Sequence, residues 1–202
     1  MNIIKQACGV YETNCYIVKG KNVDVVIDPG YKALDFIKQH CTKLAAILNT
    51  HGHYDHVWDN LDVKEYFNCE IYCPSDDIFM LDDNFSKGFK KHSKYAKAVQ
   101  DKEKLIFDEL EFTFHHFAGH TPGCSIIEFE NCYFSGDFLF YKSIGRWDFP
   151  YSDAKAMINS LNKAKNLKDN FILYPGHGIS TNTSDEKLHL DSWIRYINAN
   201  NS

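Results

Sequence analysis

The order of hydrophobic and polar positions in the first 73 residues predicts short strands alternating with helices. Apolar runs of four or five residues stop at turn-forming residues, as Asp28-Pro29-Gly30 stops the second run. The run at 44–48 has no polar position, which is typical of a strand buried on both faces. We therefore predict strands at 14–18, 23–27, 44–48 and 70–73, and helices at 31–40 and 57–67.

The pattern changes at residues 75–103, which are strongly charged and carry apolar side chains at helix-like spacing. Those side chains are Phe79, Met80, Leu81, Phe85 and Phe89. The spacing predicts a helical excursion. It serves either as a lid over a site or as an ordinary pair of amphipathic helices that pack their own apolar faces, and the sequence leaves both open.

The second half is again rich in strand-like runs. It predicts strands at 104–107, 110–117, 125–129, 132–134 and 171–174, and helices at 152–166 and 184–198. Asp153 stands near the start of the first helix, and Thr183 to Glu186 offer N-capping residues for the second. No linker-like tract separates the two halves, so we expect one domain over residues 1–202.

The composition points away from nucleic acids and membranes as partners. The chain has 202 residues, 44% of them hydrophobic, which suffices for one sizeable core. Its formal net charge of −5 disfavours phosphate binding, which requires a basic surface. No apolar run approaches the roughly 20 residues that span a bilayer, and the N-terminal residues lack a signal peptide's apolar core. We expect a cytoplasmic protein that acts on a small molecule, of undetermined oligomeric state.

The cysteines are scattered along the chain, odd in number, and include no C-x-x-C pair. They are Cys8, Cys15, Cys41, Cys69, Cys73, Cys124 and Cys132. This usage predicts reduced, mostly buried thiols rather than a disulfide framework.

The strongest chemical signal is the segment Thr50 to His56, where three imidazoles and one carboxylate follow a predicted buried strand within six residues. These side chains are the natural ligands of zinc and related metals. On an extended segment His51 and His53 point the same way and can share one metal. Asp55 and His56 follow where the chain begins to turn, so they can face a second metal.

Three further candidates stand at the ends of predicted strands. They are His120 before Thr121-Pro122-Gly123, Asp137 after Ser135-Gly136, and His177 between Gly176 and Gly178. Small or turn-forming residues flank each one, so the backbone can present all three side chains to a shared cleft.

The chain carries four motifs in this order: H-x-H-x-D-H, G-H-T-P-G, S-G-D and P-G-H-G. With them, the segment from about Asn14 to Gly178 resembles the metallo-β-lactamase superfamily. The resemblance implies an α/β (α+β) fold, the four-layer αββα sandwich, with the site at one edge. It implies His51, His53 and His120 on a first metal, Asp55, His56 and His177 on a second, and Asp137 bridging the two. Asp28 would orient a ligand histidine.

Within the superfamily the chain is most similar to the glyoxalase II group. By that resemblance Arg146 would contact the substrate carboxylate, for which a guanidinium is well suited. The sequence departs from the group at Trp58 and Asp59, where small residues are usual, and at Asp148 and Ile179, where aromatic residues are expected. We expect the chain to lack the long C-terminal helical domain that completes the glutathione pocket in that group.

The implied activity is two-metal hydrolysis of a thioester such as S-D-lactoylglutathione, by a hydroxide that bridges two divalent ions. Zinc is the expected metal, with iron or manganese as alternatives, and Asp55 would be both a ligand and a catalytic residue. Three other readings stay open. One is a persulfide dioxygenase-like enzyme with one iron on His51, His120 and Asp137; the others are a lactonase or β-lactamase and a non-enzymatic metal store.

Overall fold

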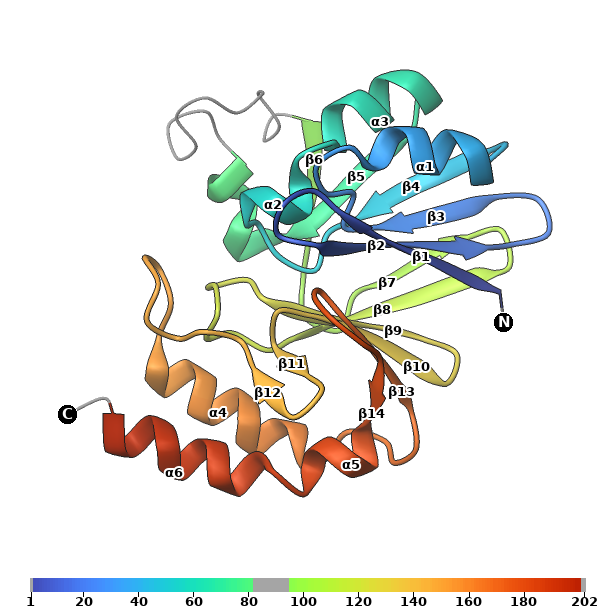
Figure 1. Ribbon diagram of the computed structural model, residues 1–202. Coiled ribbons are helices and arrows are strands. Elements are labelled where there is room, and N and C mark those ends of the chain that lie inside the picture. Colours follow the sequence, from blue (N-terminus) through green and yellow to red (C-terminus); the bar gives the residue numbers. More distant parts are fainter. Residues whose placement is uncertain (1, 82–94, 201–202) are drawn as a thin grey trace.

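The computed structural model describes residues 2–81 and 95–200 and contains two six-stranded sheets packed face to face (Figure 1). The first sheet uses the N-terminal half, and its spatial order follows the chain. Its strands are β1 (Ile3–Cys8), β2 (Thr13–Lys19), β3 (Asp24–Ile27), β4 (Leu44–Leu48), β5 (Glu70–Pro74) and β6 (Ala96–Val99). The pairs from β3 to β6 are parallel, so the carboxyl ends of these strands share one edge.

The second sheet uses the C-terminal half. From edge to edge its strands are β14 (Thr181–Asn182), β13 (Ile172–Pro175), β10 (Cys132–Gly136), β9 (Ser125–Phe129), β8 (Leu110–His116) and β7 (Lys104–Phe107). A separate short ribbon pairs β11 (Leu139–Phe140) with β12 (Ser143–Ile144). Since β10 and β13 are parallel, their carboxyl ends also lie together.

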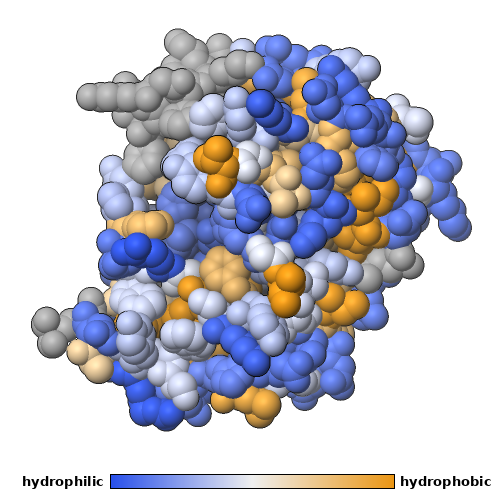
Figure 2. All heavy atoms as spheres, viewed as in Figure 1, coloured by the Kyte–Doolittle hydropathy of each residue, from blue (hydrophilic) through white to orange (hydrophobic). Residues whose placement is uncertain are grey.

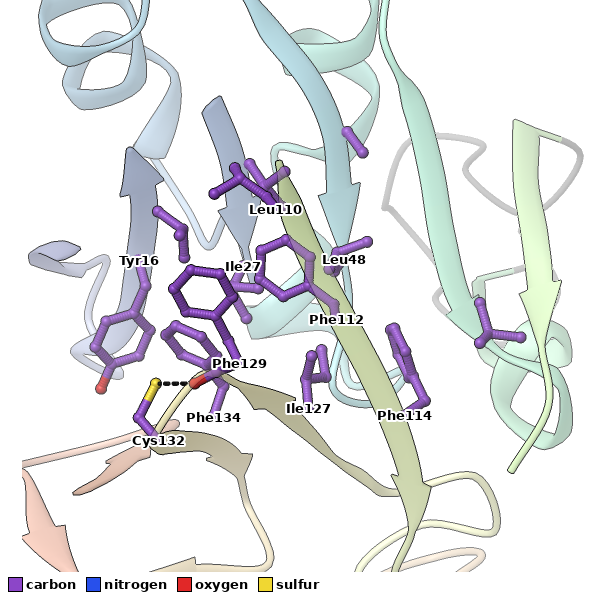
Figure 3. Close-up of a cluster of buried hydrophobic side chains, with 14 residues drawn as sticks. Tyr16, Ile27, Leu48, Leu110, Phe112, Phe114, Ile127, Phe129, Cys132 and Phe134 are labelled. Atoms are coloured by element: carbon purple, nitrogen blue, oxygen red, sulfur yellow. Dashed lines mark hydrogen bonds between the residues drawn. The ribbon is translucent and has the colours of Figure 1, made fainter. Parts of the chain in front are cut away.

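The main core lies between the sheets, where side chains from their facing surfaces interdigitate (Figure 3). The first sheet contributes Tyr16 and Leu48, and the second contributes Phe112 and Phe134. The rings of Tyr16 and Phe134 are 5.3 Å apart. Ile17, the next residue on β2, faces the opposite side of the sheet, because side chains alternate along a strand.

Helices cover the outer face of each sheet (Figure 1). They are α1 (Ala33–His40) and α3 (Asn60–Phe67) on the first sheet, and α4 (Ala154–Ala164) and α6 (Leu190–Asn200) on the second. Ile37 and Val63 are buried against the first sheet, Met157 and Leu161 against the second. Three shorter helices are α2 (Tyr54–Val57), the 3-10 helix η1 (Ser75–Leu81) and α5 (Thr183–Lys187). The predicted αββα sandwich is therefore confirmed.

The helical excursion predicted for residues 75–103 is wrong in its last part. That part forms β6, which pairs in parallel with β5 at the edge of the first sheet. Completing a backbone ladder there outweighs a weak helical pattern. The first part is the single helix η1, with Met80 and Leu81 buried. Residues 82–94, with most of the predicted excursion and lid, lie outside the described residues.

The single helix predicted at 184–198 is in fact two, because α5 ends at Lys187 and α6 begins at Leu190. The N-cap of α5 is Asn182, one residue before the predicted capping run, and its side-chain oxygen accepts a hydrogen bond from the Asp185 backbone at 2.9 Å. Strands β1, β11, β12 and β14 were absent from the prediction.

Two expectations from composition can be compared with the structure. All seven cysteines fall in the described ranges and are buried free thiols, as predicted. Within residues 2–81 and 95–200, no helix combines the length and apolar character needed to cross a membrane. On the face seen in Figure 2, hydrophilic residues predominate and hydrophobic ones emerge in small separate groups.

Candidate metal centre

The structure brings together all seven residues predicted as metal ligands. Each stands in a connection that leaves the carboxyl end of a strand: four follow β4, and one each follows β8, β10 and β13. The residues are His51, His53, Asp55, His56, His120, Asp137 and His177. Both halves of the chain contribute, because three of the seven come from the second sheet.

The first cluster consists of His51, His53 and His120, whose ligand nitrogens lie within 4.8 Å of one another. His51 Nε2 is 3.1 Å from His53 Nδ1, so the two alternate histidines do face the same point. His51 is fully buried and His120 nearly so. Three imidazole nitrogens converging in this way are a suitable donor set for a divalent metal.

The second cluster consists of Asp55, His56 and His177, whose ligand atoms also lie within 4.8 Å of one another. His56 Nε2 is 3.3 Å from His177 Nε2, and His177 Nε2 is 3.4 Å from Asp55 Oδ2. Asp55 and His56 are adjacent on α2, and the His56 ring lies close to that of His51, with ring centres 4.2 Å apart. The cluster combines two imidazoles with a carboxylate.

Asp137 lies between the two clusters. Its Oδ1 is 3.3 Å from His56 Nε2, and its Oδ2 is 3.4 Å from both His120 Nε2 and His177 Nε2. One carboxylate thus reaches nitrogens of both clusters, which is the position predicted for a bridging residue.

Two buried atoms of this site support a metal ligand set. Among the described residues, His120 Nε2 and Asp137 Oδ1 are buried with no hydrogen-bond partner. A buried polar atom without a partner is costly unless something else satisfies it. A divalent cation would satisfy a lone pair on each, so the residues present fit a metal.

The protonation of the site differs between the clusters. Burial and the neighbouring imidazoles lower the pKa of His53 to about 3 and that of His51 well below its usual range, which leaves both neutral. Burial would also lower the pKa of His56, but the Asp55 and Asp137 carboxylates outweigh it and raise this pKa well above its usual range. Similarly, contacts with Asp137 and Asp55 raise the pKa of His177 to about 9 against the effect of burial.

The same contacts keep the carboxylates of the second cluster ionised. Burial would raise the pKa of Asp55, but His56 and the hydrogen bond with His177 lower it to about 2. The second cluster without a metal is therefore a set of ion pairs between imidazolium and carboxylate groups. A metal that binds there must displace the protons of His56 and His177.

The ligand histidines are oriented through their second ring nitrogens. His120 Nδ1 donates to the Arg146 carbonyl at 2.8 Å, and His177 Nδ1 donates to the Tyr11 carbonyl at 2.9 Å. His56 Nδ1 lies 3.0 Å from Asp28 Oδ2, the contact predicted for Asp28. Such partners fix the tautomer and the ring direction of a ligand histidine.

Asp28 is itself held rigidly. Its Oδ1 accepts a hydrogen bond from the Thr50 backbone at 2.8 Å, and its Oδ2 accepts one from the Thr50 hydroxyl at 2.6 Å. We expect Asp28→Asn to weaken zinc binding by about 10- to 100-fold, because the amide cannot replace the carboxylate on His56. Competition with a chromophoric chelator measures this.

A matched control is Asp24→Asn, which alters another buried carboxylate at the far end of β3, where Asp24 pairs with Lys19. That variant should bind zinc as the parent protein does. Equal affinities for the two variants would contradict the orienting role of Asp28.

A second buried carboxylate beside the site, Asp77 of η1, was missed in the sequence analysis. Its Oδ2 accepts hydrogen bonds from the Gly52 backbone at 2.9 Å and the Thr121 hydroxyl at 2.6 Å. Its Oδ1 accepts one from the Gly123 backbone at 2.6 Å. Asp77 therefore ties the loop of His51 and His53 to the loop of His120.

Two residues of β2 also support the site and were missed. Thr13 donates a hydrogen bond from its hydroxyl to Asp55 Oδ2 at 2.8 Å. The Asn14 amide donates to the carbonyls of Pro175 and Gly178 at 2.9 and 3.0 Å, which fixes the loop of His177. Only the predicted strand around Asn14 pointed to this region beforehand.

Arg146 is not brought into the clusters. Its guanidinium donates to both carboxylate oxygens of Asp148, with the Nε contact at 2.7 Å, and lies 4.5 Å from the centre of the Phe149 ring. Its side chain is 60% exposed. The guanidinium is thus already matched by a carboxylate of the chain, and its contact with a substrate stays a prediction.

A hollow of about 540 Å³ opens over the clusters. Ligand residues form its base, and Tyr11, Tyr54, Phe149 and Pro150 complete its walls. Its size suits a small organic molecule. A carbonyl group placed in it would lie beside both clusters, so the arrangement can support metal-assisted hydrolysis.

Known proteins share this fold. The family model described as the metallo-beta-lactamase superfamily matches residues 8–177. A hydroxyacylglutathione hydrolase of Haemophilus influenzae is 33% identical over 203 residues, covering 93% of this chain and 95% of the relative. The chain covers nearly the whole of that relative.

Two solved structures are also similar. The B3 metallo-beta-lactamase BLEG-1 is 26% identical with a TM-score of 0.85, covering 96% of this chain and 99% of the other. A protein solved in a di-iron-bound form is 28% identical with a TM-score of 0.78, covering 90% of this chain and 95% of the other. With its fold, its converging ligand set and the matched family model, the chain belongs to the metallo-beta-lactamase superfamily.

Proposed function

We propose that this protein is a thioester hydrolase of the glyoxalase II-like kind, working with two divalent cations, zinc in the first instance. The proposal rests on the two ligand clusters with Asp137 between them. Together they offer a donor set for each cation. The similarity to a hydroxyacylglutathione hydrolase over nearly the whole chain supports the choice of thioesters.

When bound, such cations polarise a carbonyl oxygen and lower the pKa of water, which yields hydroxide near neutral pH. The first cluster, the second cluster and Asp137 would hold them. Asp55 is ionised at neutral pH and held by Thr13, so it can accept a hydrogen bond from the attacking water and orient it. A thiolate leaves readily, because its conjugate acid has a pKa of about 8.5, so no acidic side chain is needed.

The test is hydrolysis of S-D-lactoylglutathione by the purified protein, with metal content measured on the same sample. We expect turnover, two metals per chain, loss of activity after chelation and recovery on adding zinc. Absence of thioester hydrolysis in a protein loaded with two metals would overturn the proposal.

The same preparation distinguishes the other chemistries of this superfamily. Cleavage of a β-lactam without thioester cleavage would point to the activity named for BLEG-1. One iron per chain, with oxygen uptake on glutathione persulfide, would instead indicate a dioxygenase.

A further inference from the structure

A second hollow of about 540 Å³ lies beside the one over the metal clusters. We call it the aromatic hollow. Its walls include Val10, Tyr11, Tyr31, Tyr54 and Trp58, and Asp55 is part of its lining. The two hollows share Tyr11, Tyr54 and Asp55 in their linings, so the aromatic hollow adjoins the candidate site at its second cluster.

The aromatic walls come from three segments that pack edge to face. Tyr54 and Trp58 are four residues apart across α2, which places them on one side of the helix, with ring centres 6.4 Å apart. Tyr31 meets Trp58 at 4.9 Å, and Tyr11 meets Tyr54 at 5.6 Å. Because these rings pack against one another, the apolar surface they make is already formed before a ligand binds.

The hairpin between β1 and β2 forms one wall of the aromatic hollow. It can lie close to Tyr31 because Gly9 has no side chain. Gly9 has a φ of 69°, and a Cβ on it would lie 2.9 Å from the Cβ of Tyr31. The next residues, Val10 and Tyr11, then stand at the rim, where they are 86% and 56% exposed. Large apolar side chains left open to solvent beside a polar site are typical of a binding surface.

In the part of the chain that the structure describes, the lining of the aromatic hollow offers no basic side chain to an anionic group. Among the described residues, neither hollow is lined by a lysine or an arginine, and Asp55 is part of the lining of the aromatic hollow. Lys32 lies 5.2 Å from the centre of the Tyr31 ring but is not part of the lining. The guanidinium of Arg146 donates a hydrogen bond to the carboxylate of Asp148.

We propose that the aromatic hollow receives the acyl group of the thioester, and that this group is uncharged and apolar, with an aromatic ring or several carbons. The inference rests on the proposed function. The acyl chain and the thiol extend in opposite directions from the carbonyl, and the two hollows offer two directions. The other hollow is lined largely by candidate ligands, whereas among the described residues Asp55 is the one charged residue that lines the aromatic hollow, which therefore suits the apolar acyl side.

The test compares S-acetyl, S-butanoyl and S-phenylacetyl esters of N-acetylcysteamine, whose thiol is neutral, with the metal-loaded full-length protein. We expect kcat/KM for phenylacetyl to exceed that for acetyl by at least about tenfold. Trp58→Ala and the more exposed Tyr31→Ala should each lower this ratio severalfold. Tyr66→Ala, which removes an exposed ring outside both hollows, should leave the ratio unchanged.

A binding measurement separates this inference from the proposed function. Calorimetry is done with hydrolysis-resistant analogues in which a methylene group stands between the sulfur and the carbonyl, with a methyl or a benzyl group as the acyl end. Tighter binding of the benzyl analogue, reduced by Tyr31→Ala, supports the aromatic hollow even if no thioester is cleaved. Equal binding of both analogues, or equal kcat/KM across the ester series, would overturn it while leaving thioester hydrolysis intact.

Discussion

Asp137→Asn should lower kcat/KM of the metal-loaded protein by about 10³-fold or more. The loss expected on disturbing metal assistance is several kcal/mol, and each 1.36 kcal/mol is tenfold in rate. Asp137 is the residue whose carboxylate reaches nitrogens of both clusters, and the amide is neutral and offers one acceptor oxygen instead of two. Metal content should fall below that of the parent protein.

Activity and metal content are measured together, by thioester cleavage and elemental analysis of the same samples. Asp169→Asn provides the control, because Asp169 is an exposed carboxylate that pairs with Lys187 rather than with a candidate ligand. A variant at Asp137 that keeps its full metal content and activity within tenfold of the parent would refute the bridging assignment.

Asp77→Ala should lower the free energy of unfolding by about 3 kcal/mol or more. The substitution leaves three buried donors, on Gly52, Thr121 and Gly123, without their acceptor, and each such loss costs about 1–3 kcal/mol. Urea unfolding of the zinc-loaded protein measures the change. Because the two loops that Asp77 joins carry the first cluster, zinc affinity should also fall by about 10- to 100-fold.

The neighbouring residue supplies a matched control. Asp76 lies on the same 3-10 helix, but its side chain is 61% exposed, and its contacts are with Ser75 and His116. Asp76→Ala should change stability by less than about 0.5 kcal/mol. If the two variants were equally stable and bound zinc equally well, Asp77 would have no role in joining the loops.

The sequence predicts most of this fold because its strands are either continuously apolar or bounded by clear turns. The run Leu44 to Leu48 is predicted with its observed limits. The prediction is wrong for strand β6 because its sequence, Ala-Lys-Ala-Val, is as compatible with a helix as with an edge strand. What makes it a strand is the open edge of β5, which is a tertiary feature.

The convergence of the seven candidate ligands was predictable because four of them stand in one short motif and the other three have turn-forming neighbours. The role of Asp77 could not be predicted, because the sequence does not distinguish it from the neighbouring acidic residue Asp76. Only the packing of η1 determines that Asp77 is buried while Asp76 is exposed. The pairing of Arg146 with Asp148 is likewise a matter of side-chain conformation, which spacing does not reveal.

Each ligand cluster draws on both halves of the sandwich. His56 and His177, which face each other across 3.3 Å, are separated by 121 positions in the chain. Only the folded chain brings these distant residues together, so a cation held between them would stabilise the folded state over the unfolded one. The free energy of unfolding would then depend on the concentration of free metal. A shortage of metal would make the chain more susceptible to proteolysis and would also abolish its catalytic activity.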